Sequence, residues 1–290
     1  MTRDLVGYGN KQFAFEWPDK ARLAINFVIN YEEGAELSPV NGDNEAEQYG
    51  CDFPFGKKTK GKRNFSVESY YEYGSRVGIW RLTDLFDHHQ IPLTFFVTGY
   101  ALILNPLFSN YLAKSIHEVA GHGWRWIDYS KINKNTEQKH IYRCIETLEQ
   151  LTGQRPQGWY TGRRSKNTRD LLVDMGGFIY DSDSYADDLP YKIKEHLVIP
   201  YSLDCNDFRF TTTPGFSTSN DFFNQLKSTF DVLYHENKPS LMTIGLHPRI
   251  SGKPGPSGAV KQFLSYIQDY EGLWITKRID IARYWLSQNQ

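Results

Sequence analysis

Short apolar segments alternate with segments of helical periodicity from residue 75 to the end of the chain. Together with LAINFVI, the apolar segments predict strands at residues 23–29, 93–98, 117–122, 157–162, 178–183, 196–201, 241–247 and 273–276. The segments between them predict helices from Ser75, over 106–116, from Asn135 or Thr136 to Leu151, and over 168–175, 219–236, 257–270 and 279–287. Strands separated by helices form βαβ units, so we expect an α/β protein with a parallel sheet.

The simplest arrangement is one domain over residues 1–290, an irregular (β/α) barrel of seven or eight parallel strands. An irregular N-terminal arm and a long polar loop over residues 34–65 belong to it. We interpret the basic stretch KKTKGKR (57–63) as solvated loop, and we hypothesise that the long loop covers the active site. An open doubly wound sheet is the alternative, although GxGxxG and GxxxxGK[ST] are both absent.

Composition narrows the classes of partner. Lys and Arg total 33 and Asp and Glu total 34, so the net charge of -1 gives no field for nucleic acid or an anionic membrane. Cys51, Cys144 and Cys205 form neither a CxxC pair nor a disulfide framework. The N-terminus MTRDLVGYGNKQ lacks the apolar core of a secretory signal, and the apolar run 91–104 is too short to cross a bilayer. We therefore expect a soluble, cytoplasmic protein that acts on a small molecule.

Titratable side chains collect where the predicted strands end, which is where (β/α) barrels carry their active sites. Five strand ends contribute Glu32 and Glu33; His122; Trp159, Tyr160 and Arg163; Asp181, Asp183, Tyr185, Asp187 and Asp188; and His247 and Arg249. Structural readings remain open: a solvated Glu32–Glu33 pair, strand-end histidines that bond carbonyls, and a turn capped by Asp187 and Asp188. The other histidines examined, at positions 88, 89, 140, 196 and 235, are predicted to be surface groups.

The spacing of potential ligands does not indicate a metal. A catalytic metal needs three convergent protein ligands, and the chain has no HExxH. A His-x-x-x-His segment starting at His122 would need histidine at position 126, where Trp126 stands, so His122 and Glu33 give only two ligands. No serine or cysteine lies in a nucleophile elbow. The spacing therefore leaves a metal possible but does not indicate one, and no other cofactor is indicated.

Five segments resemble the motifs of the polysaccharide deacetylase, or NodB-like, superfamily, which folds as an irregular (β/α) barrel. They are NYEEG (30–34), HGWRW (122–126), GWYTGRRS (158–165), YDSDSYADDLPY (180–191) and GLHPR (245–249). The chain departs from the superfamily in its Glu-Glu pair, which replaces Asp-Asp, and in Trp126. The resemblance implies that the histidine replaced by Trp126 is a zinc ligand, which argues against metal-dependent deacetylation.

Longer phrases are similar to one subfamily, the cofactor-independent allantoinases of purine (urate) catabolism. They include NFVINYEEGAE, YEYGSRVGIWRL, HGWRWIDY, YDSDSYADDLPY, IGLHPR and RIDIARYW, and the similarity runs from about Asp4 to Trp285. Gly121, where serine is common, and Pro248 are local differences. The resemblance implies hydrolysis of allantoin to allantoate without a metal, in a homo-oligomer that is expected to be a tetramer.

Ring opening by water needs a base, an acid for the leaving nitrogen and donors for the oxyanion. We assign catalytic roles to Glu32, Glu33, His122 and His247, and substrate binding to Trp126, Trp159, Tyr160, Arg163, Asp183 and Arg249. The base is Glu32, His122 or His247; a histidine with the ordinary pKa of about 6.5 suits that role. The alternatives are a metal-dependent deacetylase or amidase of N-acetylated sugars or peptidoglycan, and a non-enzymatic sugar-binding protein.

Overall fold

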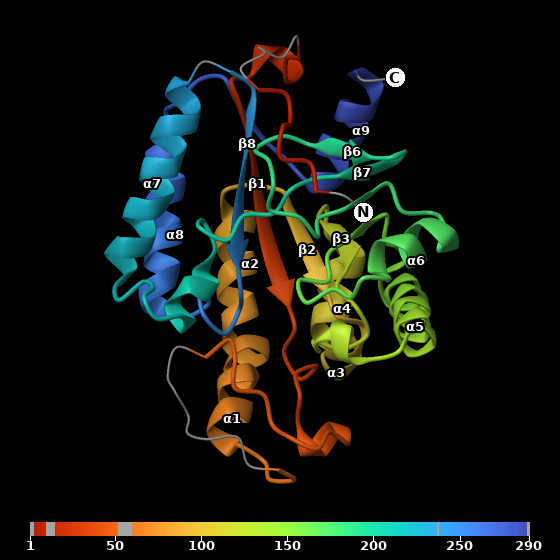
Figure 1. The fold of residues 1–290 in the computed structure, drawn as a ribbon. Helices are drawn as coiled ribbons and strands as arrows, with labels where there is room; N and C mark the ends of the chain where they lie inside the picture. Colours follow the sequence, from red (N-terminus) through yellow and green to blue (C-terminus); the bar gives the residue numbers. More distant parts are fainter. Residues whose placement is uncertain (1–2, 10–14, 52–59, 237, 289–290) are drawn as a thin grey trace.

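The computed structural model describes residues 3–9, 15–51, 60–236 and 238–288 (Figure 1). Its sheet has the strand order β6-β7-β5-β4-β3-β2-β1-β8, and β9 pairs with β1. The strands are β1 (Leu23–Tyr31), β2 (Leu93–Val97), β3 (Glu118–Gly121), β4 (Gly158–Trp159), β5 (Tyr180–Asp181), β6 (Tyr191–Ile193), β7 (His196–Val198), β8 (Ser240–Leu246) and β9 (Leu273–Ile275). Every strand predicted from the sequence is present, and within the described residues only β6, antiparallel to β7, was missed.

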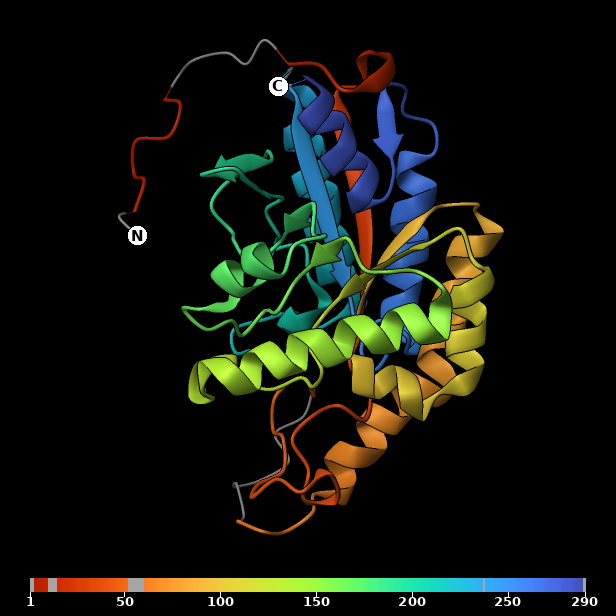
Figure 2. The same cartoon turned by 90° about the vertical axis from the view of Figure 1, so that its right-hand side faces the viewer.

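The sheet curls into a half-barrel, which confirms the predicted fold class (Figures 1 and 2). Along β1, residues 23–29 pair with β8, residues 27–31 with β2 and residues 23–25 with β9. Because β8 occupies one edge of β1, β2 and β9 share the other edge. No β8–β7 ladder is formed by the described residues; a single bridge joins Gly245 of β8 to Asn206. The barrel is therefore open along this seam.

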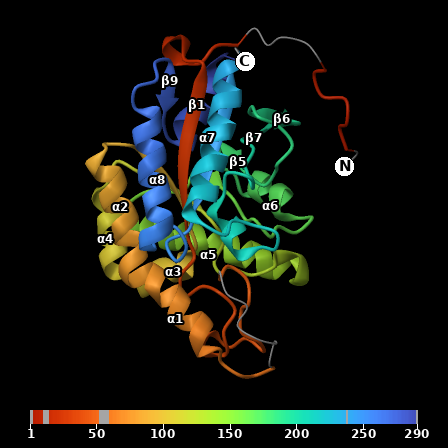
Figure 3. The same ribbon diagram turned by 90° about the vertical axis from the view of Figure 1, so that its left-hand side faces the viewer.

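The helices of the described residues are α1 (Phe65–Tyr73), α2 (Ile79–His88), α3 (Gly99–Leu104), α4 (Pro106–Lys114), α5 (Lys134–Thr152), α6 (Thr168–Met175), α7 (Ser219–His235), α8 (Pro254–Ile267) and α9 (Arg278–Gln288). Helices such as α2, α7 and α8 cover the outside of the curled sheet (Figure 3), whereas α9 packs with the core that includes Ala24 and Val28. None of the helices in the described part of the chain is long and apolar enough to cross a membrane.

Two predicted helix starts were wrong. Ser75 does not cap a helix, because α1 begins after Asn64 and continues through a π-helical turn (Gly74–Gly78) into α2. The cap of α5 is Asn133, whose side chain accepts a hydrogen bond from the backbone N–H of Thr136. Helices α1 and α3 were not predicted, because glycine and aromatic residues obscure their apolar periodicity.

The side chains of β1 alternate between two cores, as expected for a strand. Ala24 and Val28 point into the barrel, whereas Leu23, Ile25 and Phe27 pack beneath the outer helices. The predicted N-terminal arm is only partly irregular, because Trp17 is buried inside the barrel and its indole N–H donates to the carbonyl of Ser240 at 2.9 Å. Residues 52–59 of the long loop, with Lys57, Lys58 and Thr59 of the basic stretch, lie outside the described residues.

Two histidines predicted to lie at the surface are partly buried. His140 packs against Tyr129, and burial lowers its pKa to about 4. His196 lies 3.0 Å from the Asp181 carboxylate. Both predictions were wrong because Tyr129 packs against the α5 face that carries His140, and because β7, which begins at His196, pairs with β5 on one side and β6 on the other.

Candidate active site

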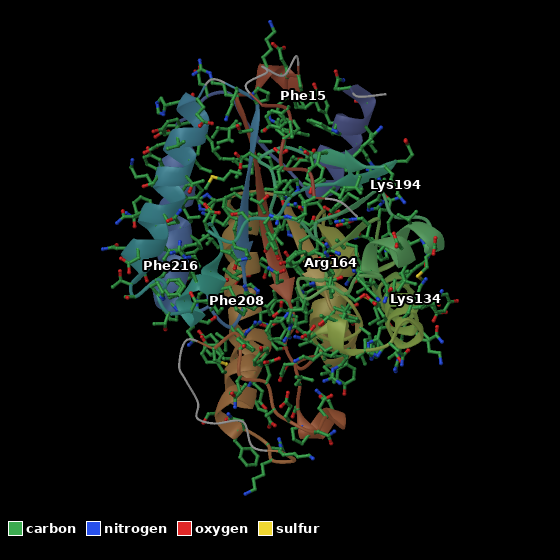
Figure 4. The ribbon with its side chains drawn as sticks, viewed as in Figure 1. Phe15, Lys134, Arg164, Lys194, Phe208 and Phe216 are labelled. Carbon is green, nitrogen blue, oxygen red and sulfur yellow. The ribbon has the colours of Figure 1, made fainter. Side chains whose placement is uncertain are left out.

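The ends of β1, β3 and β8 bring Glu32, His122 and His247 together, and each is at most 4% exposed. These residues follow buried strands directly, so the rigid sheet sets their positions. In the view of Figure 4, Phe208 and Arg164 lie on opposite sides of this end of β1. Three of the predicted catalytic side chains therefore form one buried cluster, and Glu33 lies against it.

Glu32 is the centre of the cluster. Its Oε1 lies 3.0 Å from His122 Nε2 and 3.6 Å from His247 Nε2, and its Oε2 accepts from Arg249 Nη2 at 2.7 Å. Burial alone would raise the pKa of this carboxyl, but Arg249 and then the histidines outweigh burial and hold it well below its ordinary value. Glu32 is therefore ionised at neutral pH.

The partners of the two ring nitrogens of His122 indicate where the ring carries hydrogen. Its Nδ1 lies 2.5 Å from the carbonyl oxygen of Tyr160, which can only accept, so Nδ1 carries a hydrogen. Its Nε2 lies 3.0 Å from the Glu32 carboxylate, so a proton bound at Nε2 is shared between His122 and Glu32. The two groups can therefore bind a proton as one pair.

His247 is held by Asp207, a residue that the sequence analysis missed. Asp207 accepts from the His247 ring through Nδ1 at 2.6 Å and from the His247 backbone N–H at 2.7 Å. Burial lowers the pKa of His247, but the Asp207 and Glu32 carboxylates outweigh burial and raise it to about 9. His247 is therefore an imidazolium at neutral pH, so its interpretation as a base with an ordinary pKa was wrong.

Arg249 is enclosed by protein, whereas Glu33 also lines a cavity of about 320 Å³. Arg249 is fully buried; its Nη1 lies 3.4 Å from Glu33 Oε1, and its Nε donates to the Gly50 carbonyl at 2.8 Å. Burial raises the pKa of Glu33 despite this partner. Its Nη2, Nη1 and Nε face Glu32, Glu33 and the Gly50 carbonyl in turn, so the guanidinium is placed to hold the acidic pair.

Aromatic side chains cover the cluster. Trp126 lies between two guanidinium groups, 3.9 Å from Arg163 and 5.2 Å from Arg249, measured to the ring centroid. Phe208 contacts the His247 ring with 5.3 Å between centroids. Arg163 donates to Glu47 Oε2 at 3.2 Å, so the described part of the long loop packs onto this cover. Of these residues, Phe208 and Glu47 were not predicted.

The side chains of Tyr160 and Trp159 lie on opposite sides of the sheet, because adjacent strand residues point to opposite faces. Tyr160 stacks beneath His122, with ring centroids 5.3 Å apart and an interplanar angle of 8°. Trp159 instead packs in the outer core against Phe178. Its side chain is not brought to the cluster.

Asp183 supports the backbone near the site. Its carboxylate accepts from the backbone N–H groups of Thr161 and Gly162 at 2.8–3.0 Å, and burial, then Asp181, raise its pKa to about 6. Asp187 lies apart and accepts from the backbone N–H of Leu189 and the Tyr8 hydroxyl. Asp183 thus shapes the turn that follows β4, and Asp187 has the turn-capping role kept open above.

Comparison with known proteins gives the family. The family model "Polysaccharide deacetylase" matches residues 59–177. A putative polysaccharide deacetylase of Schizosaccharomyces pombe is 35% identical over 99% of this chain and 98% of its own length. The chain belongs to the polysaccharide deacetylase family. Two solved structures with a TM-score of 0.96 cover 99% of the chain: PuuE allantoinase, 46% identical over 98% of that chain, and a probable polysaccharide deacetylase of Pseudomonas aeruginosa PAO1, 45% identical over 99% of that chain.

The catalytic metal implied for the polysaccharide deacetylase family does not fit the donor set of this member. Within the described residues, no group of three His, Cys, Asp or Glu side chains is arranged to hold a metal ion. The indole of Trp126 cannot replace an imidazole ligand, and the Arg249 guanidinium already bonds both carboxylates of the acidic pair. We therefore derive no catalytic step through a metal.

Proposed function

We propose that this member of the polysaccharide deacetylase family hydrolyses the cyclic amide of allantoin to give allantoate, without a bound metal. The observation that carries the proposal is the buried Glu32 carboxylate between His122, whose Nε2 lies 3.0 Å away, and the imidazolium of His247 at 3.6 Å. Such a set supplies both a proton acceptor and a proton donor. The likeness over the whole chain to PuuE allantoinase supports allantoin as the substrate.

Ring opening joins the oxygen of one water molecule to the ring carbonyl carbon and breaks the carbon–nitrogen bond. One water proton moves to the His122–Glu32 pair, and the imidazolium of His247 protonates the departing ring nitrogen. The new carboxyl group then loses a proton, so one proton is released for each allantoate formed. Proton transfer by positioned groups of this kind typically contributes about 10²–10⁴-fold to the rate.

The surroundings suit a small, neutral substrate. Tyr160, Trp126 and Phe208 provide apolar walls around the cluster and exclude water from the reacting groups. Arg163, on the outer face of Trp126, is 26% exposed in its side chain and is placed to bond a substrate carbonyl. Because the catalytic groups are almost fully buried, the substrate enters by displacement of this cover.

The same likeness leads us to propose a role in purine (urate) catabolism in the cytoplasm and a homotetrameric assembly. Light scattering coupled to size exclusion should then give about four times the 33.7 kDa of one chain. A mass of one chain at micromolar concentration would contradict the tetramer.

A metal-dependent deacetylase is the second candidate, because relatives found by sequence carry deacetylase names; the Helicobacter pylori peptidoglycan deacetylase is 23% identical over 75% of this chain. A substrate panel separates the two. The protein is incubated with allantoin or with N-acetylglucosamine oligomers, and products are identified by NMR. We expect allantoate and no acetate. Acetate release without allantoate would establish the deacetylase instead.

A further inference from the structure

The Arg249 guanidinium lies between the carboxylates of two adjacent glutamates. Its Nη2 is 2.7 Å from Glu32 Oε2, and its Nη1 is 3.4 Å from Glu33 Oε1. The backbone N–H of Arg249 also donates to Glu33 at 3.3 Å. All three side chains are buried, and two neighbouring buried carboxylates require a positive charge close to them.

The guanidinium is enclosed as well as paired. It lies 4.3 Å from the ring centroid of Tyr71 and 5.2 Å from that of Trp126. Gly50 closes one edge, where its carbonyl accepts from Nε; a Cβ at Gly50 would lie 2.6 Å from Nη2. Aromatic faces and carbonyl acceptors are what a desolvated guanidinium needs. The fold therefore builds a dedicated place for this cation.

Trp126 connects this arrangement with the metal centre implied for the family. It stands where the resemblance implies a zinc-binding histidine, and its ring faces the guanidinium. Tryptophan in place of histidine removes a metal ligand and adds an aromatic ring against the Arg249 guanidinium. Both changes are explained if a cation of the protein itself has taken the place of a metal ion.

We propose that Arg249 is the built-in cation of this site, a positioning residue that does the electrostatic work of the metal implied for the family. It neutralises the Glu32–Glu33 pair and fixes Glu32 Oε1 toward His122 and His247. Since an arginine cannot be removed by a chelator and stays protonated in proteins, the site is permanently charged. This inference does not depend on the substrate; only its turnover measurement rests on the proposed function.

Chemical rescue tests the role directly. Arg249→Ala should lower kcat on allantoin by about a hundredfold or more, with a smaller change in KM. Guanidinium chloride at tens of millimolar should raise its thermal midpoint and restore part of kcat, whereas equal sodium chloride should not. Arg249→Lys should retain more activity than Arg249→Ala. If guanidinium acts no better than sodium chloride on folded Arg249→Ala, the proposal is wrong.

A second measurement uses Co²⁺ as the probe and needs no turnover. The double variant Trp126→His, Arg249→Ala restores a third ligand and empties the cation's place, so it should bind equimolar Co²⁺ with visible d–d absorption. The unaltered protein should show no such bands, and Arg163→Met, which removes the arginine on the other face of Trp126, should not create them. Equimolar Co²⁺ binding by the unaltered protein would overturn the proposal, as would no binding by the folded double variant.

If Arg249→Ala does not fold, a third experiment tests whether Arg249 offsets the charges of Glu32 and Glu33. The triple variant Glu32→Gln, Glu33→Gln, Arg249→Met removes both charges of the acidic pair with the cation. It should fold and melt well above Arg249→Met alone, because no unpaired charge is left buried. If the triple variant unfolds as readily as Arg249→Met, Arg249 serves packing only and the proposal fails. Absence of allantoin turnover by the unaltered protein would refute the proposed function but leave the Co²⁺ and melting results valid.

Discussion

His122 and His247 are similarly buried, but their hydrogen-bond partners give them different proton chemistry. His122 bonds a backbone carbonyl and shares a proton with Glu32, whereas His247 bonds the Asp207 carboxylate. A carbonyl is a neutral acceptor and a carboxylate is an anion. Asp207 therefore favours the charged form of His247, which suits His247 to be the acid of the proposed reaction rather than its base.

We predict that His247→Gln lowers kcat/KM by about 10²–10⁴-fold because it removes the proton donor. In the unaltered protein, kcat/KM should fall as pH rises through about 9, where His247 loses its proton. That alkaline limb should be absent from His247→Gln. The pH dependence of initial rates for the two proteins checks this, and an unchanged alkaline limb in the variant would assign it to another group.

Glu36 gives a prediction about stability. It is 4% exposed, and burial raises its pKa to about 7. Since the pKa of an unfolded glutamate is about 4.3, the folded state binds this proton more tightly, and the stability it contributes is lost as pH rises through about 7. Glu36→Gln stays neutral, so its free energy of unfolding relative to the unaltered protein should rise from pH 5 to pH 8 by about 3 kcal/mol.

Urea unfolding at several pH values measures this difference. Glu72→Gln is the matched control, because Glu72 lines the same cavity, of about 320 Å³, from its exposed side. The control should keep the pH profile of the unaltered protein. Parallel profiles for Glu36→Gln as well would show that Glu36 does not carry the proton.

Among the elements, the continuous helix formed by α1, the π-helical turn and α2 places Gly74 and Gly78 directly against the loops that follow β1 and β8. A Cβ on Gly74 would lie 2.5 Å from Glu33 Oε1, and one on Gly78 would lie 2.0 Å from the carbonyl oxygen of Pro248. This close approach fixes Glu33 and the turn that follows His247. It also explains why the glycines interrupt the apolar pattern that the sequence analysis used to find helices.

We predict that Gly78→Ala is destabilising by about 1–3 kcal/mol, because the added methyl group meets backbone that must shift. The shift acts on the loop of His247 and Arg249, so kcat should fall too. Gly258→Ala in α8 is the control, since nothing lies within 4 Å of its added Cβ, and it should be neutral or stabilising. Calorimetry and initial rates check both variants; equal melting of the two would refute the contact.

The positions of Glu32, His122 and His247 could be predicted from the sequence, because each of these residues directly follows a buried strand. Asp207 and Gly50 were not, since a 3₁₀ helix and a loop bring them to the site from distant parts of the chain. Trp159 shows a different limit. Its strand has two residues, too few for alternation to reveal which neighbour faces inward.

In the whole molecule, the half-barrel brings the charged residues of the candidate site together at one end, where we propose that Arg249 stands in for a metal ion. Glu32 and His122 come from neighbouring parts of the sheet, whereas Arg249 reaches them from the loop after β8. Tyr71 of α1, Gly50 of the long loop and Trp126 together enclose this cation. We therefore propose that the complete fold hydrolyses allantoin with protein groups alone.

Turnover of allantoin by metal-stripped protein distinguishes catalysis by protein groups from catalysis by a metal. The protein is treated with EDTA and dipicolinate, its residual metal content is measured by mass spectrometry, and allantoate formation is followed. We predict unchanged kcat at a metal content far below one ion per chain, with no gain on addition of Zn²⁺. Loss of turnover on stripping, with recovery on stoichiometric Zn²⁺, would contradict the account.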